Sequence, residues 1–199
     1  MKKRLLGVVA TLLVCASLSP AQAFNYNEAT DGDLSGNGLI PSMLSAASGV
    51  NSLAMTSATG DRDYFSFTVP AGYWLTSIIH KTYASADDLS FFALQAGSTF
   101  TEPPVGAEST HLLGYVHFGV PTVGTEIIDN LATSNTLPQP AIGFTAPLTA
   151  GPYTFWVQQT GAAAAYSVDF VLTPVPEPAT WALLLPGVLG LAAARRRRR

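Results

Sequence analysis

Pairs of aspartates two positions apart are the residues of this chain whose spacing best suits a metal ion. Asp31 and Asp33 lie in a glycine-rich stretch, and Asp61 and Asp63 come directly before an alternating stretch. Carboxylate oxygens in a flexible loop suit calcium, which takes roughly six to eight oxygen ligands. The alternative is that these residues form turns and keep the surface soluble. We expect a calcium site only if the fold brings the two pairs together.

Aromatic rings are the second candidate group, because an exposed ring can stack on a sugar. By alternation along their strands, Trp74 and Trp156 are better placed for exposure than Phe155, which fits a buried position. Packing in the core is the alternative interpretation for both tryptophans. The sequence therefore predicts sugar stacking at Trp74 and Trp156 only if these side chains reach the surface.

The remaining reactive side chains do not form a recognisable catalytic or zinc site. His111 and His117, taken as one strand, would lie about 20 Å apart, too far to share a metal ion. His80 is isolated in the sequence, and we expect all three histidines at the surface or in loops. The chain has no G-x-S-x-G elbow and no glycine-rich phosphate loop. We expect no enzyme and no catalytic residue, with a hydrolase built on an unrecognised carboxylate pair as an alternative.

The elements that would position these residues are short strands separated by turns. Residues 63–69 alternate, with an inward and an outward face. We expect Phe65, Phe67 and Val69 to face inward and Tyr64, Ser66 and Thr68 to face outward. Further strands are expected at residues 73–83, 89–95, 112–118, 153–159 and 166–172, with the last two as a hairpin, and short uncertain ones at 127–128 and 142–144. This pattern predicts an all-β fold, a single antiparallel, jelly-roll-like β-sandwich.

Composition and charge narrow the class of protein. The 199 residues are 48% hydrophobic and only 12% charged, enough for one domain with a sizeable core. Two basic and twelve acidic residues lie between Phe24 and Thr173. A body this acidic repels nucleic acid, so we expect no nucleic-acid partner.

The N-terminus has the three parts of a secretory signal peptide, over residues 1–23. Lys2, Lys3 and Arg4 precede an apolar stretch, and Ala21 and Ala23 form an A-x-A cleavage site. Cleavage there by signal peptidase would remove Cys15, the single cysteine. The exported chain would then need no disulfide chemistry.

The C-terminus, residues 174–199, combines a rigid motif, an apolar stretch and a basic end. Residues 181–194 would form a helix about 21 Å long, short for a hydrocarbon core of about 30 Å, so we expect a transient membrane association. The order of the three parts resembles the PEP-CTERM sorting signal, which implies processing by the membrane protease exosortase and delivery to the cell surface or extracellular polysaccharide. The motif residues are Val175, Pro176, Glu177, Pro178, Arg195, Arg196, Arg197, Arg198 and Arg199.

The body carries a second, more diffuse resemblance, over residues 28–173. The stretch GDRDYFSFTVPAG, residues 60–72, is similar to the bacterial pre-peptidase C-terminal domain, as are DDLSFF from Asp87 and the ending from residue 150. The resemblance implies a β-sandwich of a kind that in some members binds calcium or extracellular polymers. Residues 100–145 depart from it as an apparent insertion.

These observations predict three segments: a signal peptide at 1–23, a β-sandwich domain at 24–173 and a sorting signal at 174–199. We expect an exported protein of the cell surface or extracellular matrix, membrane-associated before processing. The leading hypothesis is a non-enzymatic structural component associated with exopolysaccharide. The alternative is a carbohydrate- or calcium-binding module.

Overall fold

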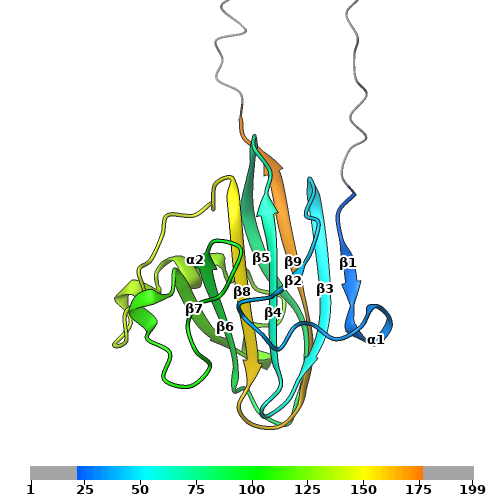
Figure 1. Cartoon of the computed structure of the whole chain (residues 1–199), viewed down its shortest axis with the longest axis vertical. Coiled ribbons are helices and arrows are strands. Elements are labelled where there is room, and N and C mark those ends of the chain that lie inside the picture. Colours follow the sequence, from blue (N-terminus) through cyan, green and yellow to red (C-terminus); the bar gives the residue numbers. More distant parts are fainter. Residues whose placement is uncertain (1–21, 177–199) are drawn as a thin grey trace, which may run out of the picture.

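The computed structural model describes residues 22–176, in which two β-sheets pack face to face (Figure 1). The strand orders are β1-β3-β9-β5 and β2-β4-β8-β6-β7. The four-stranded sheet consists of β1 (Asn25–Asn27), β3 (Gly49–Ser57), β9 (Ala164–Pro174) and β5 (Tyr73–Ala84). The five-stranded sheet consists of β2 (Ser42–Met43), β4 (Arg62–Val69), β8 (Gly151–Gln159), β6 (Ser90–Ala96) and β7 (Gly114–Phe118).

Five short helical segments complete the described elements. A four-residue helix, α1, follows β1 directly, and the other four lie between β6 and β8. Their bounds are α1 (Glu28–Asp31), η1 (Ser109–His111), η2 (Val120–Thr122), α2 (Ile128–Ala132) and η3 (Ser134–Thr136). The short strand considered at Ile127–Ile128 is therefore wrong, since Ile128 begins α2, and residues 142–144 form no strand.

The sheets are mixed, so the expectation of a purely antiparallel sandwich is wrong at one edge of each. The long strands pair antiparallel, as β3 does with β9 and β4 with β8. The two short N-terminal strands instead pair parallel, β1 with β3 and β2 with β4. The N-terminal segment therefore runs from an edge of one sheet to an edge of the other.

The core lies between the sheets and is rich in phenylalanine. Phe65 and Phe67 of β4 face inward as predicted and are almost fully buried. Phe65 stacks on Phe155 of β8, with ring centroids 5.0 Å apart, and meets Phe170 of the opposite sheet edge-on at 5.7 Å. Full burial of one such side chain contributes about 1.5–3 kcal/mol. These contacts hold the two sheets together.

The outer face of the five-stranded sheet is covered in part, which corrects the prediction for two residues of β4, whereas Thr68 is exposed as predicted. Tyr64 and Ser66 were expected to face water, but both are buried. A second apolar cluster forms over this face, and several members come from the segment between β6 and β8, which was expected to be an insertion. The cluster consists of Tyr64, Ala93, Phe100, Leu112, Ala141 and Trp156.

The last two strands do not form the predicted hairpin. β8 pairs with β4 and β6, whereas β9 pairs with β3 and β5 in the other sheet. The short connection between them crosses from sheet to sheet. Alternation had correctly predicted the strands at 153–159 and 166–172, but alternation does not say which strands are neighbours.

The predicted signal peptide and apolar tail helix lie almost wholly outside the described residues. Within residues 22–176, no helix is long and apolar enough to cross a membrane.

Candidate functional sites

The N-terminal segment carries acidic residues across one end of the sandwich. β1 pairs with β3 in the four-stranded sheet, and Ser35 then bridges to Tyr64 of β4 in the five-stranded sheet. Between them, α1 begins after Asn27, whose side-chain oxygen accepts a hydrogen bond from the N–H of Ala29 at 3.0 Å. We call residues 28–41 the crossing segment; Figure 1 shows α1 at its start, beside the sandwich.

Three carboxylates converge where the crossing segment meets β4. One oxygen each from Glu28, Asp33 and Asp63 lies within 4.8 Å of the others. Glu28 is half-buried, Asp33 is exposed and Asp63 is 0% exposed. With all three ionised, neither oxygen of Asp63 has a hydrogen-bond partner. A buried carboxylate in this state is costly unless a proton or a cation neutralises it.

The electrostatics of this acidic cluster follow from burial and mutual repulsion. Burial first, and then the charges of Glu28, Asp61 and Asp33, raise the pKa of Asp63 to about 9. Burial raises the pKa of Glu28 too, opposed by hydrogen bonds from the N–H groups of Thr56 and Leu34. Within the described part of the chain, no ion pair joins any of these carboxylates to a cation.

The structure brings together part of the predicted calcium set. Asp33 and Asp63, one from each predicted pair, are in the cluster, whereas Asp31 and Asp61 are not. Asp31 instead accepts a hydrogen bond from the N–H of Asn27 at 2.8 Å. Glu28 was not predicted, because it precedes the glycine-rich stretch and sits in α1. Its closeness in the sequence to Asp31 and Asp33 was the only signal that could have pointed to it.

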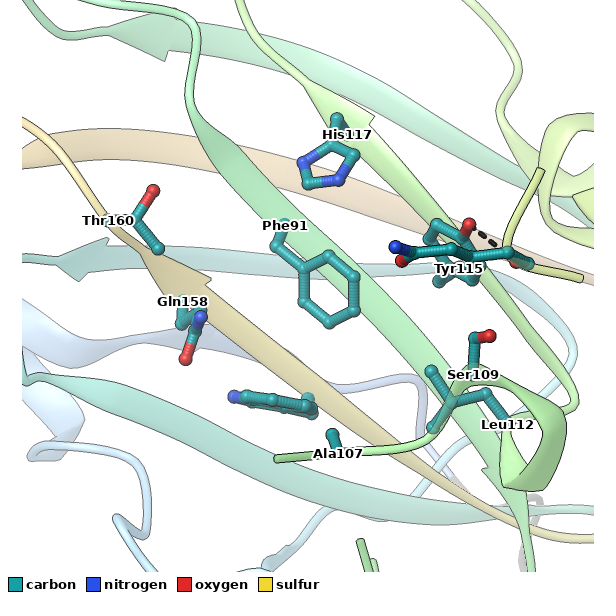
Figure 2. A pocket seen from close by; sticks show the side chains of 10 residues that line it. Phe91, Ala107, Ser109, Leu112, Tyr115, His117, Gln158 and Thr160 are labelled. Atoms are coloured by element: carbon teal, nitrogen blue, oxygen red, sulfur yellow. Dashed lines mark hydrogen bonds between the residues drawn. The ribbon is translucent and has the colours of Figure 1, made fainter. Parts of the chain in front are cut away.

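A pocket of about 210 Å³ opens on the outer face of the five-stranded sheet (Figure 2). Its wall combines aromatic rings with polar side chains from β6, β7 and β8. The ring centroid of Phe91 lies 5.1 Å from that of Trp156, 5.8 Å from Tyr115 and 5.4 Å from His117. Gln158 and Thr160 lie on the other side of Phe91 from Tyr115 (Figure 2).

One polar group of the pocket is hydrogen-bonded to the loop before β8. The hydroxyl of Tyr115 donates to the carbonyl of Gln139 at 2.7 Å, the bond drawn in Figure 2. The indole N–H of Trp156 is buried without a hydrogen-bond partner. Apolar rings with a few convergent hydrogen-bonding groups are typical of small-molecule and sugar sites.

The structure separates the two tryptophans that were predicted to be exposed. Trp156 is only 3% exposed, so its predicted exposure is wrong: the segment after β6 covers its face of the sheet. It still lines the pocket beside Phe91. Trp74 is half-buried on β5, in the other sheet, and pairs with Thr173 of β9. The two residues therefore do not belong to one site.

The histidines lie in three different settings. His80 was expected at the surface, but it is fully buried on β5, where Nδ1 lies 2.8 Å from the hydroxyl of Thr122. Burial lowers the pKa of His80. His111 is exposed in η1, 2.8 Å from Glu102, and His117 is exposed on β7. They do not share a strand as assumed from the sequence.

Comparison with known proteins adds one finding. Residues 174–199 match the PEP-CTERM protein-sorting motif. This chain carries a PEP-CTERM sorting motif. The motif implies an exported protein that is sorted through the membrane and processed by exosortase.

The motif confirms the resemblance seen in the C-terminal sequence, and most of it lies outside the described residues. No curated protein and no solved structure matches the chain. The resemblance of residues 28–173 to the pre-peptidase C-terminal domain is not supported by these comparisons and stays a prediction.

Proposed function

We propose that this PEP-CTERM protein is a non-enzymatic component of the cell surface or extracellular matrix that binds exopolysaccharide. The observation that carries the proposal is the pocket on the outer face of the five-stranded sheet. Phe91 offers a half-buried ring, and Gln158 and His117 offer hydrogen-bonding groups beside it. This mixture suits a sugar ring, whose faces are apolar and whose edges are hydroxylated.

The charge of the domain is consistent with a neutral or cation-bridged polysaccharide rather than a polyanion. The twelve acidic residues of the body far outnumber Arg62 and Lys81. Lys81 is already paired with Asp169 at 3.4 Å. Binding should therefore depend on ring stacking and hydrogen bonds, and should weaken little when salt is added.

A hydrolase is the less favoured alternative. Its chemistry would need two carboxylates that reach a polymer. Asp63 and Glu28 are close enough to share a hydrogen bond when one is protonated, but Asp63 is 0% exposed. A buried side chain at the end of the sandwich offers no contact for a glycosidic bond. We therefore assign no catalytic residue.

The test is co-sedimentation of the purified chain with exopolysaccharide from its own cells. We expect saturable binding in the wild type. In His117→Ala combined with Gln158→Ala, we expect about a tenfold weaker affinity, equivalent to about 1.4 kcal/mol. Both side chains can be truncated without opening the core, since neither is fully buried.

The matched control is Trp74→Ala, which removes an aromatic side chain from the other sheet. Its affinity should equal that of the wild type. Equal losses in Trp74→Ala and in the pocket variant would contradict the proposed site. Absence of any saturable binding by the wild type would contradict the proposed function.

A further inference from the structure

We propose that Glu28, Asp33 and Asp63 form a calcium site that fastens the crossing segment to the end of the sandwich. This site is remote from the sugar pocket in the fold: it draws on α1 and β4, whereas the pocket draws on β6, β7 and β8. The inference therefore does not depend on polysaccharide binding.

The spacing of the carboxylates admits a calcium ion. Calcium lies about 2.4 Å from its oxygen ligands, so two ligands on opposite sides of it are about 4.8 Å apart. The three carboxylate oxygens lie within 4.8 Å of one another. A single ion can thus contact one oxygen from each residue, and water can complete its coordination on the exposed side, where Asp33 lies.

The second observation is the state of Asp63. Its side chain is 0% exposed, and neither oxygen has a hydrogen-bond partner while the neighbouring acids are ionised. An aspartate that served only to make a turn or to keep the surface soluble would be exposed or bonded to backbone N–H groups, as Asp31 is. The buried oxygens of Asp63 instead need a proton or a cation to neutralise them, and the convergence of three carboxylates on one point favours a divalent cation.

No side chain in the described residues takes the place of that cation. Arg62 is the adjacent residue, but side chains alternate along a strand, so Arg62 lies on the opposite face of β4 from Asp63. Arg62 shares that outer face with Tyr64. The charge of Arg62 lowers the pKa of Tyr64, although burial, the stronger effect, raises it. Lys81 is paired with Asp169. The cluster therefore concentrates negative charge that an external ion can neutralise.

The donor set favours calcium over other metals. All three side chains offer oxygen, and no histidine or cysteine belongs to the cluster, as zinc would require. Magnesium needs nearly ideal octahedral geometry at about 2.1 Å and keeps most of its water. Calcium tolerates irregular carboxylate cages and is plentiful outside cells. Extracellular calcium modules bind with Kd values of about 10⁻⁴–10⁻³ M.

A bound ion would join three parts of the chain. Glu28 already accepts hydrogen bonds from the N–H of Thr56 in β3, at 2.6 Å, and from the N–H of Leu34, at 3.2 Å. Asp33 lies later in the crossing segment, and Asp63 anchors the site to β4. Calcium would thus link both sheets to the segment that crosses between them, and would stabilise the folded chain in proportion to its concentration.

The experiment is calorimetric titration of calcium chloride, to about 10 mM, into the full chain purified in mild detergent and stripped with EDTA. We expect one saturable site and a melting temperature that rises with calcium. Asp63→Asn should weaken the affinity at least tenfold. Asp33→Asn should do so too, and because Asp33 is exposed this variant keeps the fold if Asp63→Asn does not.

The matched control is Asp31→Asn, which removes one negative charge from the same segment but leaves the three ligands intact. Its affinity should stay within about threefold of the wild type, since an exposed charge is largely screened. Equal losses in Asp31→Asn and Asp33→Asn would show diffuse charge attraction and overturn the site. Absence of calcium binding by the wild type would overturn it as well, whatever the outcome with polysaccharide.

Discussion

The acidic cluster and the aromatic pocket differ in the charge and the packing of their buried side chains. At the end of the sandwich, Asp63 is buried with two unpartnered oxygens among other acids. In the pocket, Trp156 is nearly as deeply buried and its indole N–H has no partner either, but this side chain is uncharged and its ring packs against Phe91, Tyr64 and Phe100. The first region costs stability until something neutralises it, whereas the second contributes stability without a ligand. A ligand should therefore matter more to the fold in the acidic cluster.

The largest expected effect tests whether the pocket wall is core. Trp156→Ala should lower the free energy of unfolding by about 3–5 kcal/mol, because the cavity left among Tyr64, Phe91 and Phe100 cannot collapse fully. Urea denaturation measures the loss. Trp74→Ala is the control, and its smaller loss should follow from its half-buried position. If both variants lost equally little, the pocket wall would be surface and the comparison would fail.

The next effect is a pH dependence that belongs to the acidic cluster alone. The pKa of Asp63 rises from its ordinary value of 3.8 to about 9 in the folded chain, so the folded state holds a proton that the unfolded state releases. The contribution of Asp63 to the stability of the metal-free chain should therefore be greatest below pH 4. It should fall as pH rises toward 9, by at most about 1.4 kcal/mol per pH unit.

The measurement is urea denaturation in EDTA at several pH values between 5 and 9. Asp63→Asn should flatten the fall, because an amide does not titrate in this range. Trp156→Ala should shift the whole curve down and leave its slope unchanged. A slope that survived Asp63→Asn would mean that other groups cause it, and would remove the contrast between the two regions.

The sequence predicted the strands of the sandwich better than their partners. Phe65, Phe67 and Val69 follow a strict two-residue period, and the structure buries all three. The period carries no information about sheet membership, so β8 and β9 were wrongly expected to pair. It also failed for Tyr64, because the covering segment with Phe100 and Leu112 comes from a part of the chain with no clear periodicity. Long-range contacts decided these positions.

The candidate site was predictable only in part for the same reason. Close spacing suggested Asp31 with Asp33 and Asp61 with Asp63, but residues two apart on a strand share a face only if both belong to the strand. Asp61 precedes β4, which begins at Arg62. Glu28 joins the cluster because α1 turns across the sandwich end, a path that follows from the parallel pairing of β1 with β3. No local signal encodes that path.

The smallest expected effect concerns the contact between His111 and Glu102 in the segment that covers part of the pocket's side of the sheet. Glu102 accepts hydrogen bonds from Nδ1 of His111, at 2.8 Å, and from the N–H of Glu108, at 2.9 Å, and the latter bond is the main cause of its lowered pKa. The His111 side chain is 58% exposed and the Glu102 side chain 10%, so water screens the pair from the His111 side. His111→Ala should lower the free energy of unfolding by only about 0.2–1 kcal/mol at pH 6, and by less in high salt.

Urea denaturation of the wild type and His111→Ala at low and high ionic strength measures both losses. A loss above about 2 kcal/mol would mean that the pair is effectively buried. Charged groups near the pocket would then affect the free energy of unfolding as strongly as those of the acidic cluster.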